Sequence, residues 1–268
     1  MNLKTNSSFL LVVFLAFRAW GIPALTDDEL AHIQFDPKIN SQISPALTFE
    51  DENGKRVHLT DYPDGRPMVL ILGYYGCPML CTLVLNGATE CFRDLSWQAG
   101  DQFEVVFVSI DPAETPTLAK AKKASYEHAY GNVHADTWHF LVGDAASISN
   151  LADEIGFRYA YDNNAKQFAH PSGFVVLTPA ARVARYFYGI NFSAKEVDDA
   201  LRNAAGGRTQ PVTAEEQFSL LCFHYAPVHG KYGNLVMTIV RSGGIVTLIG
   251  LASLITTQSI RARKGRPK

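Results

Sequence analysis

The sequence predicts an α/β domain with a mixed sheet flanked by helices. Between residues 46 and 207, strand-like apolar runs alternate with segments of helical spacing, and a hairpin and a helix close the region, as in a sheet covered by helices. The 268 residues are 47% hydrophobic and carry a net charge of −2, which excludes a disordered chain and a nucleic-acid-binding protein. Four cysteines are too few for a disulfide scaffold.

The N-terminal segment, residues 1–21, predicts a secretory signal peptide. A short apolar core, FLLVVFLAF at 9–17, precedes the small residues Ala19 and Gly21, which fit a cleavage site. Arg18 is unusual inside such a boundary, and it leaves open an uncleaved anchor. In either case the chain that follows is exported.

The first elements of the domain follow an extended arm. Residues 22–45 are polar with scattered prolines and predict this arm. Strand-like flanks around Asn53-Gly54 then predict a hairpin over 47–59. The apolar run Met68–Leu72 predicts a buried strand, and helical spacing begins directly after it.

The remaining elements show recognisable start and stop signals. Threonine before proline predicts a helix N-terminus, an aspartate can cap another, and the pattern S-x-x-E is a capping box. The expected elements are a strand at 103–110, a helix from Thr115-Pro116 to Tyr130, a strand at 138–142, a helix between Asp144 and Gly156, a strand at 157–161, antiparallel strands at 173–177 and 183–188, and a helix from the box Ser193–Glu196 to Gly206.

The C-terminal segment predicts a membrane anchor. Residues 208–234 form a linker, and 235–260 include 19 residues without a charge, from Ser242 to Ile260, enough to cross a bilayer. The tail 261–268 carries five cations, so the positive-inside rule places it in the cytoplasm. We therefore expect a single-pass protein of the cytoplasmic (inner) membrane with its domain on the periplasmic side. A buried core helix is the alternative for this span.

Two cysteines lie where the buried strand turns into a helix. Cys77 and Cys81 are four residues apart, a spacing that places both thiols on one face of a first helical turn. Unpaired N–H groups and the helix dipole favour a thiolate there. Two such thiols can form a disulfide or hold a soft metal. The alternative of two packed core cysteines is disfavoured, because Gly76 and Pro78 predict an exposed turn.

His170 is the third candidate ligand, since it stands just before a strand in a loop of the kind that approaches the helix end. Two thiolates and an imidazole suit cuprous copper. Seven other histidines in the chain make this assignment weak from the residues alone. Cys91 is roughly 15 Å beyond Cys81 along a helix, so it is expected to be a core cysteine.

Five segments together resemble the SCO/SenC family of copper-binding proteins: GYYGCPMLC, FVSIDPAETP, WHFLVGD, GFRYAYD and FAHPSGFVVLTP. The resemblance covers about residues 40–207. It implies a thioredoxin-like fold with a hairpin at its start, and Cu(I) or Cu(II) held by Cys77, Cys81 and His170. Asp111 corresponds to an acidic residue beside the family's site. The implied partner is the CuA domain of cytochrome c oxidase subunit II, with other periplasmic copper carriers as further candidates.

The chain departs from the family pattern in its motif and its anchor. Met79 replaces an acidic residue and Thr82 a proline, which removes a carboxylate near the thiols but no ligand. The C-terminal anchor resembles that of a bacterial branch, whose CxHY-like segment corresponds here to Cys222 and His224, with His229 nearby. This segment is either a secondary metal site or a packed juxtamembrane stretch with interfacial tyrosines.

The leading interpretation is a membrane-anchored copper metallochaperone rather than a turnover enzyme. The alternative is a thiol–disulfide oxidoreductase that reduces the CuA cysteines, with either Cys77 or Cys81 as the attacking thiol and the other as the resolving thiol. A peroxidase of the thioredoxin superfamily ranks third, because it would not need His170. The sequence further predicts a reversible Cys77–Cys81 disulfide.

Overall fold

The computed structural model describes residues 32–62, 64–77, 80–131, 138–163 and 165–211, and helical residues at 241–245, 247, 248 and 250. The predicted signal at 1–21, most of the linker at 208–234, most of the span at 235–260 and the tail at 261–268 lie outside this part. Within it, no helix has both the length and the hydropathy that crossing a membrane requires.

A five-stranded mixed sheet forms the centre of the domain, in the order β5-β4-β3-β8-β9. Strands β3, β4 and β5 are parallel and bury nearly all their side chains. Strand β8 runs antiparallel to β3, and β9 runs antiparallel to β8. This confirms the predicted mixed sheet. The strands are β3 (Met68–Gly73), β4 (Glu104–Ser109), β5 (Trp138–Leu141), β8 (Gly173–Leu177) and β9 (Val183–Tyr188).

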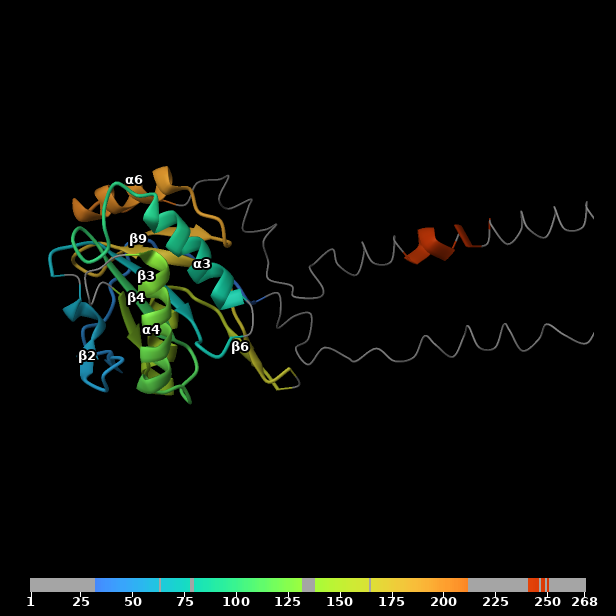
Figure 1. The fold of residues 1–268 in the computed structure, drawn as a ribbon, viewed down its shortest axis with the longest axis horizontal. Coiled ribbons are helices and arrows are strands. Elements are labelled where there is room, and N and C mark those ends of the chain that lie inside the picture. The colour runs from blue at the N-terminus through green and yellow to red at the C-terminus, as the bar shows by residue number, and fades with distance from the viewer. Residues whose placement is uncertain are drawn as a thin grey trace, which may run out of the picture.

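Helices cover both faces of this sheet (Figure 1). Alternate side chains of each strand point to opposite faces, so Val69 and Ile71 enter one apolar cluster while Leu70 and Leu72 enter the other. The first cluster includes side chains of α3 (Leu80–Arg93), α4 (Pro116–Tyr130) and α6 (Ala194–Ala205), and the second includes α5 (Ala145–Glu154).

Two short hairpins complete the domain. The predicted N-terminal hairpin is confirmed as β1 (Thr48–Glu50) and β2 (Arg56–His58), with Gly54 at φ +78° in its turn, and a 3-10 helix, η1 (Leu59–Asp61), follows it. The second hairpin joins β6 (Ala160–Asp162) to β7 (Gln167–Ala169). The strand predicted at 157–161 therefore starts three residues too early.

Residues 32–45, which the sequence predicts as part of an extended arm, pack against the domain. Ile33, Phe35 and Ile43 are buried, and Phe35 forms an antiparallel bridge with Phe157. Pairing with the arm explains why Phe157 lies outside β6. The arm therefore contributes to the domain core, although the predicted boundary stood at residue 46.

The helix caps follow the predictions in two of three cases. Thr115 Oγ1 accepts from the N–H of Leu118 at the start of α4, and Asp144 accepts from the N–H of Ser147 at the start of α5. The capping box at α6 is wrong: Ser193 is the N-cap but makes no side-chain capping bond. The partner box residue, Glu196, lies 3.9 Å from Arg185.

Candidate metal centre

The first part of the site is the loop between β3 and α3. Helix α3 begins at Leu80, so Cys81 lies in its first turn, whereas Cys77 lies before the helix. The N–H of Cys77 donates to the carbonyl of Tyr74 at 3.3 Å and closes a turn. The N–H of Cys81 donates to Cys77 Sγ, so both thiols lie together at the helix start, while the predicted helical turn between them includes residues 78 and 79 and stays a prediction. Residues 78 and 79 lie outside the described part.

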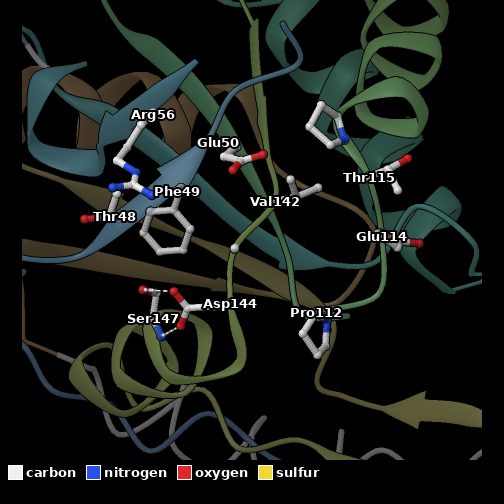
Figure 2. A pocket seen from close by; sticks show the side chains of 12 residues that line it. Thr48, Phe49, Glu50, Arg56, Pro112, Glu114, Thr115, Val142, Asp144 and Ser147 are labelled. Atoms are coloured by element: carbon white, nitrogen blue, oxygen red, sulfur yellow. Dashed lines mark hydrogen bonds between the residues drawn. The ribbon is translucent and has the colours of Figure 1, made fainter. Parts of the chain in front are cut away.

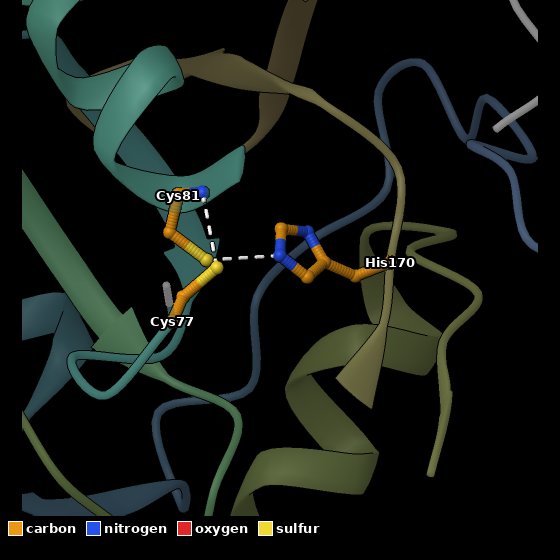
Figure 3. Close-up of side chains that lie close together, drawn as sticks. All are labelled: Cys77, Cys81 and His170. Carbon is orange, nitrogen blue, oxygen red and sulfur yellow. Dashed lines mark hydrogen bonds between the residues drawn. The ribbon is translucent and has the colours of Figure 1, made fainter. Parts of the chain in front are cut away.

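The loop between β7 and β8 brings His170 to these thiols. Donor atoms of Cys77, Cys81 and His170 all lie within 4.8 Å of one another, and Cys81 Sγ is 2.9 Å from His170 Nε2. Figure 3 shows the imidazole pointing from its loop towards both sulfurs. Cys81 and His170 are buried, Cys77 is half-buried, and neither cysteine forms a disulfide. Three residues separated by up to 93 positions thus form one cluster.

The hydrogen bonds of His170 define which ring nitrogen faces the thiols. Nδ1 lies 2.9 Å from the carbonyl of Pro171. A carbonyl only accepts, so Nδ1 carries the proton of this bond. In the neutral ring, Nε2 then has a lone pair directed at Cys81, which is the state a metal requires of an imidazole ligand.

Backbone N–H groups point at both sulfurs. The N–H of Tyr74 donates to Cys81 Sγ, and the N–H of Cys81 donates to Cys77 Sγ, each at 3.4 Å. Such bonds favour a thiolate, but burial is the larger effect at Cys81 and raises the pKa of its thiol well above the usual range, and Cys77 adds to the rise. In the metal-free protein, burial therefore opposes the thiolate predicted at Cys81.

Aromatic side chains enclose the histidine. The ring of Tyr74 meets that of His170 edge-on at 6.0 Å, and Phe157 stacks on it at 6.0 Å. Burial, with smaller effects from Cys77 and Cys81, raises the pKa of the Tyr74 hydroxyl, which keeps it neutral. The cluster is thus a polar site with apolar walls, which limits water around the three donors.

Among the described residues of the cysteine loop, Tyr75 and Gly76 contact Glu114 rather than the predicted Asp111. The carboxylate of Asp111 accepts from the N–H of Ala113 within its own turn. Glu114 instead accepts from the N–H groups of Tyr75 and Gly76, at 2.7 and 2.6 Å. Sequence reasoning missed Glu114, although its place in the loop between β4 and α4, three residues past Asp111, was a usable signal.

The other predicted cysteines do not enter this cluster within the described residues. Cys91 is buried in the apolar cluster that α3 covers, whereas Cys81 belongs to the other cluster, as expected for a core cysteine. Cys222, His224 and His229 lie outside the described residues, so the secondary site predicted there stays a prediction.

A family model described as SCO1/SenC matches residues 36–206, which include all three clustered residues and most of the domain. The chain belongs to the SCO1/SenC family. Among curated proteins, a candidate copper-binding protein of Stutzerimonas stutzeri is 24% identical over 116 residues, 43% of this chain and 52% of that protein. The chain therefore spans about half the length of that relative.

Solved structures support the fold of this SCO1/SenC domain. A candidate electron transfer protein from Aquifex aeolicus VF5 is 25% identical, with a TM-score of 0.56 over 66% of this chain and 99% of that one. BsSco, described as a member of the Sco family of cytochrome c oxidase assembly proteins, is 20% identical, with a TM-score of 0.51 over 63% and 97%. Copper-bound ScoI from Arabidopsis thaliana is 17% identical, with a TM-score of 0.50 over 60% and 96%. The thioredoxin-like fold is thereby confirmed.

Proposed function

We propose that this chain binds one copper ion through Cys77, Cys81 and His170 and passes it to a partner during cytochrome c oxidase assembly. The observation that carries the proposal is the convergence of these three donor atoms within 4.8 Å. Family membership supports it, as do the copper-related descriptions of its relatives.

The donor set suits copper as cargo. Thiolate sulfur is a soft ligand that selects Cu(I), and imidazole also suits copper. Binding displaces the proton of Cys81, and the Nδ1 bond to Pro171 keeps Nε2 available as a ligand. Zinc also accepts such donors but usually completes four ligands in structural sites, whereas the cluster in the described residues has three.

The half-buried position of Cys77 suits transfer. An incoming thiol or imidazole of a partner can approach the copper from the side of Cys77 and replace the donors one at a time, while Cys81 and His170 lie deeper. We propose the CuA site of cytochrome c oxidase subunit II as recipient. The signal peptide predicted at 1–21 and the membrane span predicted at 235–260 support a domain held on the periplasmic side of the cytoplasmic membrane.

Copper titration of the full-length, detergent-solubilised chain tests the site. We expect the reduced protein to take up one equivalent of Cu(I) without air, in competition with a chromogenic chelator. Cys77→Ser and Cys81→Ser should abolish tight uptake, because each removes a soft ligand, and His170→Ala should weaken it. Cys91→Ala and the exposed His128→Ala are matched controls that should bind like the wild type. Equal affinity of wild type and His170→Ala would refute the three-ligand site.

The arrangement of the two thiols also supports a second function, a thiol–disulfide oxidoreductase. Cys77 is half-buried in front of the buried Cys81, as an attacking thiol lies in front of a resolving thiol. This function predicts that the wild type and His170→Ala reduce an oxidised CuA domain equally fast. A chaperone predicts instead that only copper-loaded wild type restores the CuA absorbance of a reduced apo domain.

A further inference from the structure

Four consecutive N–H groups, those of residues 74–77, lead from the end of β3 to the first thiol. The N–H of Tyr74 donates to Cys81 Sγ, and the N–H of Cys77 donates to the carbonyl of Tyr74. Both of these acceptors belong to the cysteine loop and the start of α3. The N–H groups of Tyr75 and Gly76 donate to a residue from another segment, Glu114, in the loop after β4.

The Glu114 carboxylate is itself held in a fixed orientation. Its Oε2 accepts from the N–H of Tyr75 at 2.7 Å and from the hydroxyl of Ser109 at 2.6 Å, and its Oε1 accepts from the N–H of Gly76 at 2.6 Å. Hydrogen bonds to an ionised acceptor are shorter and stronger than neutral ones. Ser109 ends β4, so this carboxylate ties the loop to the central sheet.

The hydrogen bonds from the loop to Glu114 matter for metal binding because of where Cys77 lies. Cys81 is held by helix α3 and His170 by the ordered loop before β8, but Cys77 precedes the helix. If its loop were free, ligand binding would have to order it, and the lost conformational freedom would weaken affinity.

The geometry points to Glu114 as a positioning residue that holds residues 75–77 so that Cys77 Sγ stays beside Cys81 and His170. It acts through backbone N–H groups and is not itself a proposed ligand. The inference rests on the proposed function for its effect on copper, but the effect on the loop is independent of any metal.

A matched pair of variants separates this role from a simple loss of charge. Glu114 and Glu50 both line a cavity of about 580 Å³ (Figure 2), but only Glu114 accepts from residues 75 and 76 in the described structure. Glu114→Gln leaves one oxygen and puts an NH₂ donor in place of the other, so one N–H loses its acceptor. Glu50→Gln removes the same charge from the same cavity without touching the loop.

The test uses the full-length chain, with two readouts. We expect Glu114→Gln to lower Cu(I) affinity roughly 10- to 100-fold, as the loss of outer-shell partners does, while Glu50→Gln binds like the wild type. In the metal-free protein, hydrogen exchange of peptides covering 74–77 should accelerate in Glu114→Gln, and exchange of strand β4 should not. Ser109→Ala, which removes one donor to the carboxylate, should give a smaller change of the same kind.

Each outcome decides the inference. Unchanged Cu(I) affinity and unchanged exchange at 74–77 in Glu114→Gln would overturn it. Faster exchange across the whole domain, with β4 accelerated equally, would also overturn it, because that result indicates general destabilisation. If Glu114→Gln fails to fold, Ser109→Ala decides by the same two readouts. If the wild type takes up no Cu(I), the proposed function fails, and the exchange data alone decide the role of Glu114.

Discussion

At Gly73 the backbone of β3 passes close to the first turn of α3. A β-carbon at this position would lie 3.0 Å from Cys81 Sγ and 3.0 Å from the Phe107 ring. Real β-carbons seldom approach so closely, and both neighbours are buried, so neither has free space to enter. The absence of a side chain at residue 73 therefore allows the Cys81 thiol to lie against the strand and face His170.

Replacing Gly73→Ala should thus disturb the metal centre through packing. We expect destabilisation of about 1–3 kcal/mol, typical of an overpacked core, together with weaker Cu(I) binding, because the Cys81 thiol must move. Urea unfolding and copper titration measure the two effects. Gly206→Ala is the control, since its β-carbon would meet only the flexible end of Arg208 and the nearby Asn203 carbonyl at 3.5 Å. Wild-type affinity in Gly73→Ala would contradict this account.

At the scale of elements, one hydroxyl joins three parts of the chain. Tyr186 of β9 accepts from the N–H of Lys38 in the arm at 2.8 Å and donates to the carbonyl of Ile155, just past α5, at 2.9 Å. Burial raises the pKa of Tyr186 to about 12. The arm is thereby attached to the sheet by a polar contact as well as by its buried side chains.

This attachment should weaken in alkali. The pKa of Tyr186 is about 10 in the unfolded chain and about 12 in the folded protein. The neutral hydroxyl therefore makes its full contribution to the free energy of unfolding below about pH 10, and this contribution is lost as the pH rises through the folded pKa. The stability difference between wild type and Tyr186→Phe should shrink by about 2 kcal/mol between about pH 9 and pH 12. Denaturant unfolding across this range measures it.

The exposed Tyr161→Phe is the control for this experiment, since its side chain lies at the surface and its replacement should leave the alkaline profile unchanged. A difference between wild type and Tyr186→Phe that stays constant with pH would contradict the role assigned to the buried hydroxyl.

At the scale of the whole molecule, the site lies where the two apolar clusters meet. The neighbouring tyrosines after β3 point to opposite faces of the sheet: Tyr75 packs with Phe107 and Phe140 in one cluster, and Tyr74 lies in the other beside His170. The metal loop is thus anchored in both halves of the core. Its position at the carboxyl end of β3 follows a general rule for α/β sheets.

The proposed membrane topology places this domain outside the cytoplasm. The signal peptide predicted at 1–21 and the five cations of the tail at 261–268 support it, because positive residues stay on the cytoplasmic side. Protease added to intact spheroplasts should therefore digest the domain and spare an epitope tag placed after Lys268. Full protection of the domain in intact spheroplasts, with digestion after lysis, would contradict this topology.

The sequence by itself determined the strands and helices whose residues interact locally or lie in long apolar runs. Five apolar residues in a row predicted β3, and the Thr115-Pro116 and Asp144 caps predicted α4 and α5, all close to the observed bounds. The element order also predicted the mixed sheet. Two candidate thiols were visible because their motif stands at a strand–helix junction, a feature of adjacent residues.

Only the tertiary structure decided what depends on distant partners. Phe157 lies outside β6 because it pairs with Phe35. The residues alone made His170 a weak choice among eight histidines, and its contact with Cys81 depends on the fold, which brings the loop before β8 to the start of α3. The protonation of Cys81 likewise depends on burial by the folded chain, and the loop contact belongs to Glu114 because the turn after β4 directs that carboxylate, and not Asp111, towards Tyr75 and Gly76.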